Sequence, residues 1–243
     1  MPSLTLPDRL IWFAHCPKAG GTSIEQIMVA HWGEAVGHLH WGWDLWWRHG
    51  GWRVADPPNS PQHLVWADAE AQLPHAPDIV FALVRDPVTR IASEYRWQRQ
   101  KRRGTCIGKA LAYLPFSLWL RVMLAVAARN PHAFDNHFRP QSDFIPEGAR
   151  VFRLEDGLDK VVQWLSESAG APLEAIPIPK AIATRAVTKP RAGDYARIAH
   201  AYGADTARFG YSAPCDLVTP DWGDRIAKWL APLIAVLDRK GAL

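Results

Sequence analysis

The sequence predicts an α/β fold in which helices flank a mainly parallel central sheet. Two continuous apolar runs, over 10–16 and 78–85, have the length and composition of strands buried on both faces. A segment of helical character follows each run, and a third short strand is expected over 151–154. Strands that alternate with helices in this way are typical of a parallel sheet covered by helices.

The helices are expected over about 87–102, 109–129, 159–169, 194–208 and 222–239. Pro87 suits the first position of its helix, because the N–H that proline lacks has no partner there in any case. The longest apolar stretch, 116–128, contains Arg121 and is too short to cross a bilayer. We therefore expect a single domain over 1–243, closed by the C-terminal helix, with no membrane anchor.

Composition narrows the functional classes. The 243 residues are 48% hydrophobic and 21% charged, which is ordinary for a globular protein. Three cysteines without a CxxC pair argue against a disulfide scaffold and a thiolate zinc site, and they favour a reducing, cytoplasmic location. A net charge of +4 favours an anionic ligand but is too diffuse to indicate nucleic acid.

Tryptophan is the unusual component, with 13 residues in the chain. Several of these tryptophans lie in 33–62, a segment rich in Gly, Trp, Pro and His. We interpret this segment as an ordered insertion. The clustered rings could stack on sugar faces or could form a small satellite core. The cluster consists of Trp41, Trp43, Trp46, Trp47, Trp52 and Trp66.

A glycine loop joins the first predicted strand to a helix in the sequence HCPKAGGTS, over 15–23. Glycines allow the backbone to wrap an anion, and the helix N-terminus directs N–H groups and a positive dipole toward it. Lys18 adds a positive charge beside this loop. Thr22 with Glu25, and Ser23 with Gln26, have the spacing of a capping box. Taken alone, the segment could also be a plain turn between strand and helix.

The order of residues distinguishes this loop from a kinase loop. In the Walker motif, lysine follows the last glycine and a Ser or Thr after it binds magnesium. Here Lys18 precedes both Gly20 and Gly21, and no strand ends in an aspartate suited to magnesium. A phosphotransferase that uses ATP or GTP is therefore disfavoured.

A second candidate anion site follows the second strand in RDPVTRIASEY, over 85–95. Arg85 stands at the end of the strand, and Ser93 lies in the helix after it. Parallel strands open their carboxyl ends on one edge, where open α/β sheets bind ligands. Two such sites suit a nucleotide with phosphates at two separate places, although Arg85 could instead pair with Asp86 or the helix dipole.

The two motifs, HxPKxGGTS and RDPxxRxxSEY, together resemble those of the sulfotransferases that use 3′-phosphoadenosine 5′-phosphosulfate (PAPS). The similarity is greatest to the branch of heparan sulfate 2-O-sulfotransferase and its bacterial relatives. It covers 10–32 and 78–97, with weaker similarity at 136–142 and 202–211. The resemblance implies a three-layer fold like that of the P-loop NTPases. It also implies that a sulfuryl group is transferred from PAPS without a metal, and that the product formed from the donor is 3′-phosphoadenosine 5′-phosphate (PAP).

The resemblance also implies roles for individual residues. The residues expected to bind the 5′-phosphosulfate are Lys18, Gly20, Gly21, Thr22 and Ser23. The residues expected to bind the 3′-phosphate are Arg85 and Ser93. A histidine between the motifs would be the general base, and His63 lies in that interval. The rival bases are His15, His38, His40, Asp68 and Glu70.

The acceptor side is less defined by the sequence. His137, Arg139 and Gln141 could face the acceptor or could cap the backbone of the polar loop 130–148. Lys189 and Arg191 could reach the nucleotide or could be solvated. We predict a PAPS-dependent sulfotransferase that acts on a carbohydrate hydroxyl. The alternatives are a nucleotide-dependent kinase of related fold and a non-catalytic nucleotide- or sugar-binding module.

Overall fold

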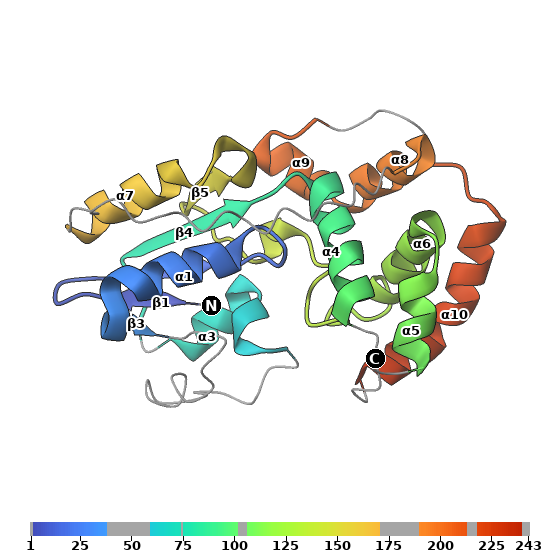
Figure 1. Ribbon diagram of the computed structural model, residues 1–243, viewed down its shortest axis with the longest axis horizontal. Coiled ribbons are helices and arrows are strands. Elements are labelled where there is room, and N and C mark those ends of the chain that lie inside the picture. The colour runs from blue at the N-terminus through green and yellow to red at the C-terminus, as the bar shows by residue number, and fades with distance from the viewer. Residues whose placement is uncertain are drawn as a thin grey trace. The chain divides into compact units, whose positions relative to one another are not determined.

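The computed structural model describes residues 2–37, 59–73, 75–101, 106–170, 190–212 and 218–239. The chain divides into two compact units (Figure 1). The first unit comprises Met1–Arg85 and Gln141–Ala183, and the second comprises Asp86–Pro140 and Thr184–Leu243. The expected single domain over 1–243 stays a prediction.

The first unit contains a five-stranded sheet with the order β3-β1-β2-β4-β5. Its parallel part, β2–β4–β5, confirms the predicted strands, and Phe13 pairs in register with Phe81. The sheet as a whole is mixed rather than mainly parallel, because β1 runs antiparallel to both β2 and β3. A tight turn joins β1 to β2, and a turn of this kind can connect only antiparallel neighbours. The strands are β1 (Ser3–Thr5), β2 (Leu10–Ala14), β3 (Val36–Gly37), β4 (Ile79–Val84) and β5 (Arg150–Arg153).

Helices α1 (Gly21–Trp32) and α7 (Asp159–Ala169) contribute apolar side chains to the core of this unit. Strand β2 is buried along its whole length, and the Phe13 and Phe81 rings stack at a centroid distance of 4.9 Å. The remaining helical segments are α3 (Trp66–Gln72) and the short 3-10 turns Gly33–Ala35, Pro61–His63, Gln141–Asp143 and Leu154–Asp156.

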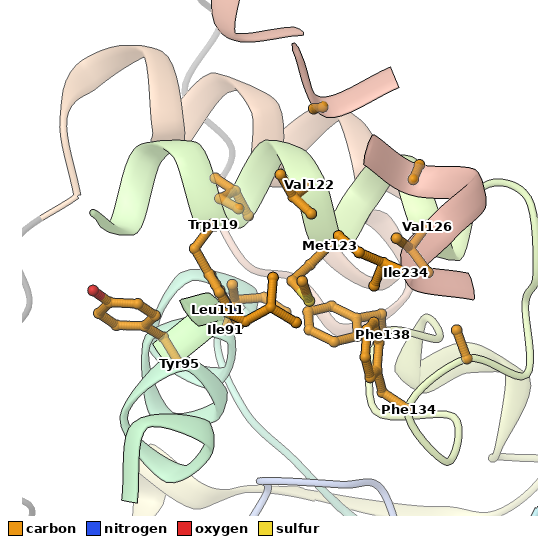
Figure 2. Packing of buried hydrophobic residues seen from close by; sticks show 14 of the residues in the cluster. Ile91, Tyr95, Leu111, Trp119, Val122, Met123, Val126, Phe134, Phe138 and Ile234 are labelled. Atoms are coloured by element: carbon orange, nitrogen blue, oxygen red, sulfur yellow. The ribbon is translucent and has the colours of Figure 1, made fainter. Parts of the chain in front are cut away.

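The described part of the second unit is helical. Its core gathers around α6, where Trp119 and Met123 pack with Phe138 and with Ile234 of α10 (Figure 2). The helices are α4 (Pro87–Lys101), α5 (Cys106–Tyr113), α6 (Phe116–Ala127), α8 (Ala192–Ala201), α9 (Gly203–Phe209) and α10 (Trp222–Arg239).

Two predicted helices are each interrupted in the structure. The helix expected over 109–129 is interrupted after α5, and Pro115 is the N-cap of α6 with extended backbone, as the fixed ring geometry of proline favours. The helix expected over 194–208 is interrupted at Tyr202, whose φ of −117° and ψ of 31° are not helical. Helices α7 and α10 have the predicted bounds. Among the described helices, none is both long and apolar enough to cross a membrane.

Candidate functional site

The loop between β2 and α1 has the wrapped backbone that an anion site requires. Lys18 and Gly20 both adopt left-handed conformations, with φ of 64° and 93°. Glycine takes this conformation without steric cost, whereas a residue with a side chain is strained there by about 1–2 kcal/mol. The strain at Lys18 is of the kind that clusters at ligand-binding sites.

The N-terminus of α1 has no side-chain cap. Its N-cap residue is Gly20, no side chain accepts a hydrogen bond there, and the first turn contains no acidic residue. The predicted capping boxes are therefore wrong, because the helix already begins at Gly21 and includes Thr22 and Ser23. Such a helix start, with its N–H groups and positive dipole, favours an anion.

Gly21 is required by the close approach of His15. A Cβ atom at this position would lie only 1.9 Å from Nε2 of His15. Glu25, which the sequence suggested as part of a cap, instead has Oε1 3.4 Å from Nδ1 of His15. The His63 ring stands edge-on to His15 with centroids 5.4 Å apart. The structure thus brings together three buried titratable side chains, His63, His15 and Glu25, behind the loop.

Arg85 follows β4 and reaches the same loop. Its Nη1 donates to the carbonyl oxygen of Lys18 at 3.4 Å. Its backbone is held by the buried side chain of Gln141: the Arg85 N–H donates to Oε1, and Nε2 donates to the Arg85 carbonyl, both at 2.9 Å. Gln141 thus holds the backbone at the end of β4 and not that of the loop 130–148, and its expected role toward the acceptor stays a prediction. Sequence reasoning could not pair these two residues, which are 56 positions apart.

His137 belongs to a polar network inside the second unit. Its Nδ1 lies 2.6 Å from Oε2 of Glu94, and Gln98 donates to the other oxygen of that carboxylate, also at 2.6 Å. The Arg90 guanidinium donates to the carbonyls of His137 and Arg139, at 3.3 and 2.8 Å. No local pattern in the sequence indicates Glu94 as the partner of His137, which lies 43 positions away. Ser93, half-buried, precedes Glu94 on α4.

The segment before His137 has an unusual backbone. Phe134, Asp135 and Asn136 are three consecutive residues with positive φ, at 54°, 57° and 61°. The Tyr202 hydroxyl donates to the Phe138 carbonyl at 3.0 Å, and burial raises the pKa of Tyr202 to about 12. The hydroxyl therefore stays protonated, and keeps its hydrogen bond to Phe138, to a more alkaline pH than an ordinary tyrosine would.

The other candidate site residues lie on α3, at the start of α8 or outside the described residues. Asp68 and Glu70 lie on α3, which Trp66 begins. Arg191 is the N-cap residue of α8, and its N–H donates to Oδ2 of Asp194 at 3.0 Å. Outside the described residues are Lys189, His38, His40 and the tryptophans of the cluster other than Trp66.

One known protein family matches the chain. A model of the sulfotransferase family matches residues 2–163, two thirds of the chain. The match includes the glycine loop and the Arg85 motif. Neither a curated protein nor a solved structure matches the chain.

Proposed function

Since this chain belongs to the sulfotransferase family, we propose that it transfers a sulfuryl group from PAPS to a carbohydrate hydroxyl. The transfer of a sulfuryl group follows from family membership. The donor, the acceptor and the residue roles are the proposal, and they rest on the chemistry of the loop between β2 and α1.

The start of α1 carries this proposal. It combines a helix N-terminus that lacks both a side-chain cap and a first-turn acid with the lysine of the preceding loop. The Arg85 guanidinium reaches the carbonyl of that lysine. The helix dipole, the backbone N–H groups and the Lys18 side chain fit a doubly anionic phosphosulfate, and the Arg85 guanidinium beside them suits a second anionic group.

The residues of this loop have separate tasks. PAPS, when bound, would supply the sulfuryl group. The backbone of Gly20 and Gly21 and the hydroxyls of Thr22 and Ser23 hold the phosphosulfate in line with the acceptor, which supplies much of the catalysis in such displacements. Lys18 neutralises the negative charge that grows on the bridging oxygen as its bond to sulfur breaks.

The 3′-phosphate is assigned to Arg85, whose position beside the loop is fixed by Gln141. The resemblance adds Ser93 as a ligand of this phosphate, a role that is a prediction from the sequence. Because this phosphate does not change charge during transfer, Arg85→Ala should weaken the binding of PAPS more than it slows the bound reaction.

His63 is proposed as the general base that takes the proton of the acceptor hydroxyl. It is only 6% exposed, and its ring rests on His15, which is itself close to Glu25. This packing limits the orientations that the imidazole can adopt. His63→Ala should reduce turnover by about 10²–10⁴ and leave PAP affinity nearly unchanged.

The binding experiment compares PAP with ATP and magnesium in thermal unfolding. A ligand that binds only the folded chain adds about 2.7 kcal/mol of stability at a hundredfold excess over Kd. We expect a clear shift with PAP, unchanged by EDTA, and a much smaller shift with ATP and magnesium. Equal shifts, or a PAP shift that EDTA removes, would contradict the assignment and favour a kinase.

The activity experiment measures the transfer of radiolabelled sulfate from PAPS to a panel of polysaccharides, lipids and small alcohols. Labelling of a polysaccharide, lost in Lys18→Ala, is the expected result. Binding of PAP without transfer to any member would favour a non-catalytic module. Labelling of a lipid or small alcohol alone would overturn the carbohydrate acceptor.

A further inference from the structure

Helix α10 exposes a stripe of large apolar side chains. Trp222 and Trp229 are 72% and 79% exposed, and Leu233 is 59% exposed. Ile226 and Val236 are exposed as well, so the stripe recurs at alternating intervals of four and three residues. This spacing places all five on one face of a helix. We call these five residues the α10 stripe.

The core of the second unit does not use this face. The side chains of α10 buried in that core are Ala227, Ala231, Ile234 and Ala235, and the partly buried Leu230 packs against it. Figure 2 shows Ile234 directed toward Val126 and Met123 of α6. The helix therefore has a second apolar face, and burial within this unit does not account for the α10 stripe.

Two exposed cations lie beside the α10 stripe, and the carboxylates near it are paired within the unit. Arg225 and Lys228 are exposed and lie one turn apart on the same side of the stripe. The nearby carboxylates are engaged within the unit: Asp221 with Arg121 at 2.6 Å, and Asp224 with Arg197 at 2.7 Å. Asp238 accepts the Phe134 N–H at 2.7 Å.

A hollow of about 450 Å³ lies at the start of α10. Its lining includes Trp222 of the α10 stripe together with both exposed cations. Two carboxylates also line it, and each is paired with an arginine, Asp221 with Arg121 and Asp224 with Arg197. Such a hollow suits an anionic group adjacent to apolar material. The lining residues are Pro220, Asp221, Trp222, Asp224, Arg225 and Lys228.

We propose that α10 binds the surface of an anionic lipid bilayer. Trp222, Trp229 and Leu233 enter the boundary between headgroups and acyl chains, where tryptophan is favoured because its ring is apolar with one polar edge. Arg225 and Lys228 pair with headgroup phosphates. An apolar face bordered by Arg and Lys is the pattern of helices that lie in a membrane interface.

A second copy of the chain suits this face less well. Exposed charges of opposite sign normally border a helix seam and select its partner. Arg225 and Lys228 are exposed beside the α10 stripe, whereas the carboxylates, including the exposed Asp221, are already paired within the unit. Self-association would therefore bring like charges together. This proposal does not depend on the identity of the sulfuryl donor or acceptor.

Co-sedimentation of the full chain with vesicles tests the proposal. We expect binding to phosphatidylcholine vesicles with about 30% phosphatidylglycerol, and much weaker binding without that anionic lipid or in about 0.5 M NaCl. Trp229→Ser should weaken binding about tenfold or more, because its burial in lipid is lost. Lys228→Ala should weaken it about fivefold.

Tyr113→Ser is the matched control, because Tyr113 is an equally exposed aromatic residue on α5 of the same unit, at 72%. It should bind vesicles like the parent, and thermal melts should show all three variants folded. Equal binding by parent and Trp229→Ser would overturn the proposal. So would equal binding to neutral and anionic vesicles. A dimer in sedimentation velocity that Trp229→Ser abolishes would assign the face to a second copy instead.

Discussion

The N-termini of α1 and α8 both carry the positive end of a helix dipole, but they differ in the charged groups beside it. At α8, Asp194 accepts hydrogen bonds from the Arg191 N–H at 3.0 Å and from the Ser117 hydroxyl at 2.7 Å. Arg121 lies 3.6 Å from the same carboxylate. At α1, glycine is the N-cap residue, and the first turn has neither a capping side chain nor an acid.

Both helix starts present positive dipoles, so a dipole alone does not identify a ligand site. The buried carboxylate of Asp194 neutralises α8 from within the chain, which makes that end structural. At α1 the first turn has no acid, and the cations Lys18 and Arg85 of the neighbouring segments add to the dipole instead of cancelling it. An exchangeable anion is therefore favoured at α1 and disfavoured at α8.

The largest expected effect comes from removing the cation at α1. Lys18→Ala should reduce single-turnover transfer from saturating PAPS by about 10²–10³, because the growing charge on the bridging oxygen loses its donor. Lys18→Arg should restore only part of the rate, since its planar fork directs hydrogen bonds differently from an ammonium group. A folded Lys18→Ala protein with a rate within threefold of the parent would remove Lys18 from the mechanism.

Removing the internal anion at α8 should affect stability instead. Asp194→Ala removes the cap and a carboxylate partner of Arg121, so we expect a loss of about 2–3 kcal/mol in the free energy of unfolding. Urea titration measures this loss. PAP affinity measured at low urea should stay within about twofold. A large loss of affinity in a folded variant would show that the two helix starts are coupled.

Thr22→Asp places a carboxylate in the first turn of α1, as Asp194 does in the first turn of α8. A carboxylate in the first turn interacts favourably with the dipole, by about 0.3–1 kcal/mol, so the melting temperature should rise by a few degrees at most. The same charge repels an anionic nucleotide, and PAP affinity should fall about tenfold or more. Thr22→Asn is the uncharged control for loss of the hydroxyl. If both variants bind PAP equally, the charge argument fails.

The smallest expected effect is in the acid dependence of stability near α10. A hydrogen bond from Arg121 lowers the pKa of Asp221. Burial acts to raise the pKa of Asp224, but the hydrogen bonds from Arg197 and from the Asp221 N–H, together with the charge of Arg197, outweigh it, and the pKa is lowered. Carboxylates that are more acidic in the folded chain stabilise it above about pH 4, and that stabilisation is lost as the pH falls toward the folded pKa.

Urea unfolding of the parent and of Asp221→Asn checks this sign. The parent should be more stable by about 0.2–1 kcal/mol near pH 6, a range typical of exposed pairs. The difference should shrink as the pH falls from about 4 to 3. A difference that stays constant or widens in acid would contradict the lowered pKa of Asp221.

Continuous patterns in the sequence predicted the parts of the fold that depend on local periodicity. The apolar runs predicted β2 and β4, and the helix expected over 159–169 is α7 with the observed bounds. Strands β1 and β3 contain three and two residues, which is too short for an alternating pattern, so the antiparallel edge was missed. Pro115 was a local signal that could have separated α5 from α6.

In the candidate site too, local sequence patterns predicted some features and could not predict others. The Lys18 loop was predicted because a strand, two glycines and a helix follow one another directly in the sequence. The capping boxes were wrong because spacing alone does not decide where a helix begins, and Gly21 starts α1 where His15 leaves no room for a Cβ atom. The partners Glu94 and Gln141 depend on long-range packing, which no local pattern records.

The side chain of Gln141 has a consequence for the order of folding. Its two hydrogen bonds to Arg85 close a loop of 56 residues. Closing such a loop costs about 3.6 kcal/mol or more in chain entropy, whereas two hydrogen bonds contribute about 1–3 kcal/mol net. The contact therefore cannot form early by itself, and the helices between its ends must first shorten the loop. In pulsed hydrogen exchange during refolding, the Arg85 amide should become protected after the amides of α4 and α6, so the cation beside the glycine loop is set in place late.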